Sequence, residues 1–247
     1  MTPERLATVA GWLKVAERVA VLTGAGVSAE SGVPTFRDAN GLWEGHAIEE
    51  VATPEAFRRQ PELVWRFYNQ RRANVRTVAP NPGHRALAAL ERRYPAGQFT
   101  LITQNVDGLH RVAGSVNVLE VHGALSRTRC TGCGRVAERG SEELPDLPRC
   151  PSCGHLERPD IVWFRETLPE DVWGTAMVAA ATCDVFLTVG TSAVVYPAAG
   201  LVEVAQRRGA KVVEVNPQET DASGSADVCL RGPSGVVLPE LLEAMTV

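Results

Sequence analysis

Two patterns in this 247-residue sequence could carry chemistry: a glycine-rich loop after an apolar run, and four paired cysteines. The run Val19–Leu22 is typical of a buried strand and leads into the loop. A G-x-G-x-x-G/A loop lets the backbone turn tightly and approach a pyrophosphate at a helix N-terminus. An ordinary turn after a strand is the alternative. The candidate cofactor-binding residues of the loop are Gly24, Ala25, Gly26, Ser28 and Ala29.

The residues after this loop do not continue a regular helix. Gly32 and Pro34 would end a helix early. Phe36 and Arg37 follow, and we expect them to form a lid over a bound, reacting cofactor. A dehydrogenase would instead continue the loop in a regular helix, with an acidic residue about 20 positions later. The interrupted helix therefore argues against a dehydrogenase.

The four cysteines form two close pairs. Cys130 and Cys133 are separated by two residues, as are Cys150 and Cys153, and sixteen residues separate the pairs. This spacing predicts a zinc site. Four thiolates complete a tetrahedron and leave no open position, so we expect one structural zinc ion. A redox dithiol is the alternative.

Polar side chains follow the predicted strand Phe99–Thr103. In open α/β sheets, groups just past the carboxyl ends of strands face the ligand crevice. Gln104, Asn105 and Asp107 offer amide and carboxylate groups that suit ribose hydroxyls and a carboxamide. An Asx-type turn would use the same residue types.

A histidine ends the next predicted strand, Val116–Val121. His122 precedes Gly123, which allows a close backbone approach. Because an imidazole has an ordinary pKa of about 6.5, it is a natural general base at neutral pH. His122 is the candidate catalytic residue, and a structural histidine is the alternative. Residues at two later strand ends could hold phosphates and a second ribose, or form polar turns: Gly190, Thr191, Ser192 and Asn216.

The elements that must position these residues alternate between strand and helix. Helical patterns begin at Pro3, Pro54, Pro61 and Asn81 and cover Ala198–Arg207 and Leu238–Met245. Further apolar runs predict strands at Ile161–Phe164, Val185–Val189 and Lys211–Val215. This alternation predicts an α/β fold with a Rossmann-like, doubly wound parallel sheet. Residues 38–75 and the cysteine region interrupt the rhythm, which indicates a smaller inserted domain with a helical module and a zinc ribbon.

Composition limits the alternatives. The net charge of −4 argues against direct nucleic-acid binding, which requires a basic surface. No signal peptide is recognisable, and glycine and proline interrupt the uncharged stretch 185–202, so we expect no membrane span and a cytoplasmic location. Cysteines are then expected to be reduced, with Cys183 and Cys229 in the core.

Taken together, these stretches resemble the sirtuins, NAD-dependent protein-lysine deacylases. The matching residues are 24–37, 103–107, 122–123, the four cysteines, 162–164, 190–192 and 215–216, in the family's order. The resemblance implies an NAD-binding domain (1–37, 76–124 and 160–247) and a small domain (38–75 and 125–159). It further implies that the chain uses NAD as co-substrate to remove acyl groups from lysines of proteins or peptides, giving nicotinamide and O-acyl-ADP-ribose, with His122 as general base.

The resemblance also implies where the substrate binds. An acyl-lysine peptide would add a strand between residues 162–166 and 194–196, against Val162, Phe164, Val194 and Tyr196. Tyr68 and Arg71, which share a helix face, look like the pair that binds the terminal carboxylate in the desuccinylase/demalonylase branch. Ala52 resembles the small residue of that branch's wider acyl pocket. Arg165 stands where the family usually has glycine and puts peptide affinity in question.

Two other functions remain open at this stage. A mono-ADP-ribosyltransferase or NAD hydrolase would use the same NAD site and base. A non-enzymatic zinc-ribbon binding protein is the second alternative, and the acidic net charge opposes its nucleic-acid form. The oligomeric state cannot be inferred from the sequence.

Overall fold

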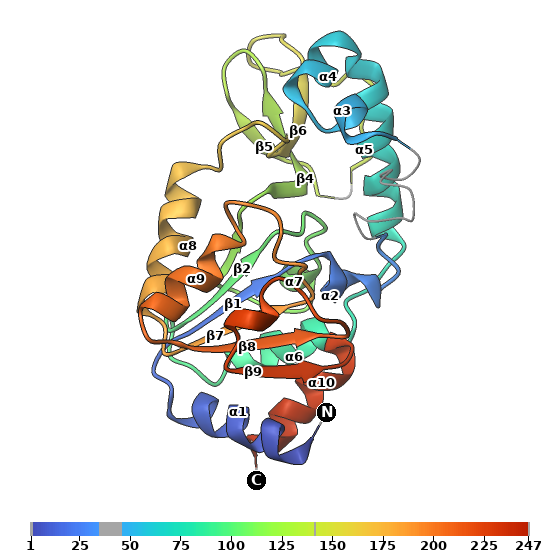
Figure 1. Cartoon of the computed structure of the whole chain (residues 1–247). Coiled ribbons are helices and arrows are strands. Elements are labelled where there is room, and N and C mark those ends of the chain that lie inside the picture. The colour runs from blue at the N-terminus through green and yellow to red at the C-terminus, as the bar shows by residue number, and fades with distance from the viewer. Residues whose placement is uncertain (1, 35–45, 141, 247) are drawn as a thin grey trace.

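A six-stranded parallel sheet forms the larger part of the molecule in the computed structural model, which describes residues 2–34, 46–140 and 142–246 (Figure 1). Its strand order is β3-β2-β1-β7-β8-β9, the order of a dinucleotide-binding doubly wound sheet. The strands are β1 (Val19–Thr23), β2 (Phe99–Thr103), β3 (Val118–Glu120), β7 (Val185–Val189), β8 (Lys211–Asn216) and β9 (Val228–Arg231). The Rossmann-like fold predicted from the sequence is confirmed.

Helices cover both faces of this sheet. Val19 and Val21 of β1 pack into one core with α1 (Pro3–Val15), α6 (Pro82–Glu91) and α10 (Ser234–Ala244). Ala20 and Leu22 point to the other face, where α8 (Glu170–Thr182) and α9 (Gly200–Arg207) close a second core. Because β1 is buried on both faces, its first four residues, Val19–Leu22, are all apolar rather than alternating.

A smaller part lies at one end of the molecule, and both termini lie at the other (Figure 1). It contains an antiparallel sheet of order β5-β4-β6, formed by β4 (Gly123–Cys130), β5 (Val136–Glu138) and β6 (Glu157–Ile161). Three helices pack with this sheet around a third core: α3 (Ile48–Val51), α4 (Pro54–Arg59) and α5 (Pro61–Arg76). The inserted helical module and ribbon are thus confirmed, whereas the residue boundaries of the two domains stay a prediction.

Local chemistry explains where two of these helices begin. The Thr53 hydroxyl accepts the Ala56 N–H at 3.1 Å, with Pro54 in the first turn of α4. At α6 the Asn81 side chain accepts the N–H groups of Gly83 and His84. The remaining short elements are α2 (Ala25–Ala29), α7 (Leu109–Val112) and the 3₁₀ turn η1 (Ser223–Ser225).

Several predicted boundaries were wrong. The strand predicted at Ile161–Phe164 is β6, which ends at Ile161, because the Trp163 N–H donates to the Glu166 carboxylate instead of a strand partner. The strand at Val116–Val121 is shortened to β3, since Glu91 accepts the N–H groups of residues 116 and 117. Helix α9 starts at Gly200 and not at Ala198, and α10 starts at Ser234 and not at Leu238. Sequence reasoning missed β4, β5, β9 and α8.

Cys183 is buried as predicted, whereas Cys229 is only half-buried. Among the described residues, no helix combines the length and apolar character needed to cross a membrane.

Candidate active site

The carboxyl ends of β1, β2 and β7 meet at one edge of the large sheet. Thr23 is in register with Thr103 on one side and with Val189 on the other. The polar segments that begin at Gly24, Gln104 and Gly190 therefore leave the sheet side by side. The topology thus brings together three stretches that are far apart in the sequence.

Backbone contacts bind the glycine-rich loop to the end of β7. The Gly24 N–H donates to the Val189 carbonyl at 3.1 Å, and the Gly26 N–H to the Gly190 carbonyl at 2.7 Å. A Cβ on Gly26 would lie 2.7 Å from the Gly190 oxygen, and one on Gly24 2.8 Å from the Thr191 Cβ. The two glycines thus allow the loop at Gly24 and the loop at Gly190 to pack closely against each other. The sequence pattern did not predict this role for the glycines. Ala25 is half-buried and Ala29 is exposed, and both lie on α2.

A buried serine connects the loop to the end of β2. The Ser28 hydroxyl donates to the Asp107 carboxylate at 2.7 Å and accepts the Asn105 side-chain N–H at 3.0 Å. Asn105 also donates to the Gly24 carbonyl at 3.0 Å. Burial raises the pKa of Asp107, while the Leu109 N–H, the Ser28 hydroxyl and the charge of Arg71 oppose that rise. The candidate residues Ser28, Asn105 and Asp107 therefore form one hydrogen-bonded cluster.

Two buried histidines extend this cluster, and sequence reasoning did not assign them to the site. The Asn81 N–H donates to His84 Nδ1, so the His84 Nε2–H faces the Ser28 hydroxyl at 3.3 Å. His110 Nε2 lies 2.9 Å from the Thr23 hydroxyl, and the two imidazole rings are 4.8 Å apart. Burial lowers the pKa of His84 to about 4 and that of His110 to about 3. The capping pattern Asn81-x-x-His84 was the available signal for His84; His110 had none beyond its place after the polar segment.

His122 lies just after β3, and a backbone carbonyl orients its ring. Its Nδ1 lies 3.1 Å from the Gln104 carbonyl oxygen. Because a carbonyl only accepts, Nδ1 of the neutral ring carries the proton and Nε2 does not. Burial lowers the pKa of His122, partly offset by this hydrogen bond, so the ring is neutral at pH 7. Nε2 is therefore the nitrogen that can accept a proton.

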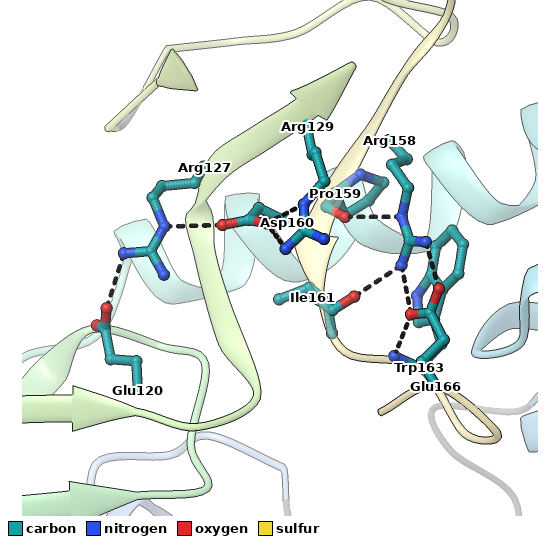
Figure 2. A network of polar contacts seen from close by, with 9 residues as sticks. All are labelled: Glu120, Arg127, Arg129, Arg158, Pro159, Asp160, Ile161, Trp163 and Glu166. Carbon is teal, nitrogen blue, oxygen red and sulfur yellow. Dashed lines mark hydrogen bonds and ion pairs between the residues drawn. The ribbon is translucent and has the colours of Figure 1, made fainter. Parts of the chain in front are cut away.

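An ionic network joins this strand end to the small sheet (Figure 2). Arg127 donates to Glu120 at 2.8 Å and to Asp160 at 3.0 Å, and Arg129 donates to Asp160 at 2.6 Å. Glu120 and Asp160 are nearly buried. At Gly123, with φ of +82°, a Cβ would lie 1.9 Å from the Asp160 carbonyl oxygen. The ionic network and the close approach at Gly123 together hold the small sheet next to His122.

Amide side chains connect the remaining cofactor candidates. Gln104 donates to the Thr191 hydroxyl at 3.1 Å, and Asn216 donates to the Thr191 carbonyl at 3.0 Å. Gly190, which precedes Thr191, adopts a φ of +58°. Ser192, which follows Thr191, is half-buried. Hydrogen bonds therefore link Gln104, Thr191 and Asn216 into one polar edge that spans the ends of β2, β1, β7 and β8. Phe36 and Arg37, the predicted lid, lie outside the described residues.

The predicted acyl-pocket residues gather in the core of the small part. Tyr68 is fully buried, and Ala52 and Trp163 belong to the same cluster. Arg71 is 8% exposed, with its guanidinium carbon 5.9 Å from the centre of the Tyr68 ring. The charge of Arg71 also lowers the pKa of Asp107.

The predicted peptide-binding segments carry exposed apolar side chains. Phe164 is 40% exposed, Val194 39% and Tyr196 68%, whereas Val162 is half-buried. The N–H groups of Val162, Trp163 and Phe164 already donate to His122, Glu166 and Ala52. A peptide strand added to this segment would therefore have to pair mainly with its carbonyl groups.

Arg165 keeps the backbone conformation that glycine would adopt freely. Its φ is +72°, and its exposed guanidinium lies 3.8 Å from the Glu55 carboxylate. Arg165 thus places a cation at the surface of this loop.

The four paired cysteines fit a zinc ion. Their sulfur atoms all lie within 4.8 Å of one another, with Cys130 Sγ 3.4 Å from Cys153 Sγ and Cys133 Sγ 3.8 Å from Cys150 Sγ. Tetrahedral zinc with bonds of about 2.3 Å requires sulfur separations of about 3.8 Å. N–H groups of Cys133 and Gly132 lower the pKa of the Cys130 thiol to about 6, which favours the thiolate that binds metal. The predicted structural zinc site is supported by this geometry.

Comparison with known proteins identifies the family of this chain. The model of the Sir2 family matches residues 24–197. The NAD-dependent protein deacylase 2 of Pyrobaculum aerophilum is 50% identical over 237 residues, 95% of this chain and 94% of that protein. A solved Sir2 homologue–NAD complex is 45% identical, with a TM-score of 0.90 over 97% of this chain and 93% of that one. A structure of Sir2 bound to acetylated peptide is 30% identical, with a TM-score of 0.85 and 98% of both chains covered. The chain, with this fold, this polar strand edge and this cysteine tetrad, belongs to the Sir2 family.

Proposed function

We propose that this protein removes acyl groups from lysine side chains of proteins or peptides, with NAD as co-substrate. The names of its relatives support this assignment: they are NAD-dependent protein deacylases, and solved relatives hold NAD or an acetylated peptide. NAD supplies an electrophilic ribose carbon from which nicotinamide can leave. The residues that would hold it are the loop at Gly24–Ala29, the cluster around Asn105 and Asp107, and the edge formed by Gln104, Thr191 and Asn216.

The orientation of His122 is the observation that carries the proposal most directly. Its Nδ1–H is held by the Gln104 carbonyl, so the unprotonated Nε2 remains for a proton from a ribose hydroxyl. Burial keeps the ring neutral at physiological pH. The same Gln104 reaches Thr191 with its side chain, so one residue couples the base to the cofactor edge.

We further propose that the enzyme accepts acyl groups that end in a carboxylate, such as succinyl or malonyl. Tyr68 offers a phenol hydroxyl and Arg71 a guanidinium, and both side chains are buried. Tyr68 belongs to the same hydrophobic core as Ala52. A charge-assisted hydrogen bond in such a pocket contributes about 1.5–3 kcal/mol, enough to determine acyl preference. The peptide backbone would lie along residues 162–166 and 194–196.

The zinc ion would have a structural role, because four thiolates leave no coordination position for substrate. Its thiolates, together with two further free cysteines, fit a reducing compartment such as the cytoplasm. The proposed NAD-binding domain comprises residues 1–37, 76–124 and 160–247, and the small domain comprises residues 38–75 and 125–159.

Mass spectrometry of matched acetyl-lysine and succinyl-lysine peptides, with and without NAD, tests the proposal. We expect NAD-dependent loss of the acyl group together with nicotinamide and O-acyl-ADP-ribose. Tyr68→Phe and Arg71→Met should lower the ratio of succinyl to acetyl turnover. If the wild type removes acetyl alone, the acidic-acyl preference is wrong. If NAD is consumed while neither peptide changes, ADP-ribosyl transfer or NAD hydrolysis replaces deacylation.

A further inference from the structure

A polar contact links the segment 161–166 to the acyl pocket. The indole N–H of Trp163 donates to the Tyr68 hydroxyl oxygen at 2.9 Å. Trp163 is 3% exposed and Tyr68 is fully buried, so water does not compete for this bond. The contact joins residues that are 95 positions apart in the chain and lies inside the third core.

The indole of Trp163 is held from its other side by an arginine. The Arg158 guanidinium carbon lies 3.4 Å from the centre of the Trp163 ring. Arg158 donates to both carboxylate oxygens of Glu166, at 2.6 and 2.8 Å, and to the Ile161 carbonyl at 2.7 Å (Figure 2). Glu166 in turn accepts the backbone N–H of Trp163 at 2.8 Å. Both the ring and the backbone of Trp163 are therefore fixed.

This arrangement determines what the Tyr68 hydroxyl can do. A phenol oxygen carries one proton and accepts through its lone pairs. Because the Trp163 N–H occupies an acceptor position, the hydroxyl proton must point away from the indole. Burial raises the pKa of Tyr68 to about 12, against the lowering effects of Arg71 and Trp163, so the proton stays in place. Tyr68 is thus a donor with a restricted direction.

We propose that Trp163 is a positioning residue that directs the hydroxyl proton of Tyr68 toward the carboxylate of an acidic acyl group. Arg158 and Glu166 support it by holding the indole in place. This inference rests on the proposed acidic-acyl function and adds a specificity determinant that acts through Tyr68 without touching the substrate. It predicts that the acyl preference depends on an indole N–H.

A double-mutant cycle tests the inference. The measured quantity is the ratio of kcat/KM for a succinyl-lysine peptide to kcat/KM for the matched acetyl-lysine peptide. We expect Tyr68→Phe to lower this ratio about 10- to 100-fold, as the loss of a charge-assisted hydrogen bond. Trp163→Phe should lower it about 3- to 10-fold, mainly through KM for the succinyl peptide, because the hydroxyl remains but loses its orientation. In the Tyr68→Phe background, Trp163→Phe should change the ratio less than about twofold.

Trp65 provides a matched control in the same core. It is also fully buried, and its indole N–H donates to a backbone carbonyl, that of Glu157, at 2.9 Å. Trp65→Phe therefore removes an equivalent hydrogen bond and should lower the melting temperature without changing the acyl ratio. If Trp163→Phe does not fold, Arg158→Gln provides a second test, because it removes the cation that holds the Trp163 ring in place. This variant should also lower the ratio of succinyl to acetyl turnover.

The outcomes separate the inference from the function on which it rests. If wild type does not process the succinyl peptide, the acidic-acyl function is wrong and the inference falls with it. If wild type processes it but Tyr68→Phe leaves the ratio unchanged, the Tyr68 hydroxyl does not bind the acyl carboxylate, and only the inference is overturned. If Tyr68→Phe lowers the ratio but Trp163→Phe affects both peptides equally, only the inference is overturned. The same holds if Trp163→Phe lowers the ratio equally with and without the Tyr68 hydroxyl.

Discussion

Acidification from pH 7 to pH 5 should lower the free energy of unfolding by about 4 kcal/mol through two buried histidines, His84 and His110. Both rings are nearly inaccessible, with 0% and 2% exposure. Burial is the main cause that lowers the pKa of His84 to about 4 and that of His110 to about 3, and for His110 the neighbouring His84 adds to it. In the unfolded chain both return to about 6.5.

The hydrogen bonds explain why a second proton is unfavourable at His110. The Thr23 hydroxyl donates to Thr103 at 2.8 Å and therefore accepts the Nε2–H of His110. Within the described part of the chain, His110 Nδ1 is buried and has no hydrogen-bond partner. A proton on Nδ1 would create a charge without an acceptor, 4.8 Å from the ring of His84.

The sign follows from proton binding. Below pH 6.5 the unfolded chain binds protons that the folded chain excludes, so stability falls as the pH falls toward the folded pKa values. At pH 5, protonation of each histidine in the unfolded chain raises the equilibrium constant for unfolding by a factor of about 30, which corresponds to about 2 kcal/mol. Above pH 7 both states are neutral at these positions, and the effect disappears.

Urea denaturation at pH 7 and pH 5, for wild type and His110→Gln, measures this effect. Glutamine keeps an N–H donor near Thr23 but does not titrate, so the variant should lose about 2 kcal/mol less than wild type between the two pH values. Losses common to both proteins, such as protonation of the zinc ligands, cancel in this difference. Nitrogen-15 spectra of wild type at pH 5 should show His110 still neutral, with the proton on Nε2. An equal loss of stability in both proteins, or a charged His110 at pH 5, would refute the reasoning.

Four further predictions follow from the structure. Gly123→Ala should reduce kcat/KM about 100-fold, because its Cβ would lie 1.9 Å from the Asp160 oxygen; Gly97→Ala, with a similar φ of +83° and open space around it, should keep activity. Chelation of zinc should unfold the small part and abolish deacylation, with recovery on zinc addition; activity that survives complete zinc removal would contradict this. Arg165→Gly should raise the free energy of unfolding by about 1 kcal/mol in urea denaturation, because the left-handed backbone costs glycine little, and an unchanged or lower stability would count against it. The acid limb of the pH–rate profile should lie below pH 6.5, since burial lowers the pKa of His122, and a limb above that value would contradict a neutral, buried base.

The sequence alone predicted the fold class, the cysteine tetrad and most of the polar residues at the edge of the large sheet. These features depend on local patterns: apolar runs between helical stretches, a fixed cysteine spacing, and polar residues at strand ends. Parallel strands place their carboxyl ends on one edge, so Gln104, Asn105 and Thr191 could be assigned to a common site before their contacts were known. His122 was predicted as the catalytic base for the same reason.

Tertiary structure decided the contacts that no local pattern encodes. The pairing of Gly26 with Gly190, the hydrogen bonds of Ser28 to Asp107 and Asn105, and the Trp163–Tyr68 contact join segments separated by tens to more than a hundred residues. Strand ends also depended on remote partners: β6 stops where the Glu166 carboxylate accepts the N–H of Trp163. The sequence predicted which groups could do the chemistry, whereas hydrogen bonds to residues distant in the sequence determined the proton positions on His122 and His110 and the direction of the Tyr68 hydroxyl.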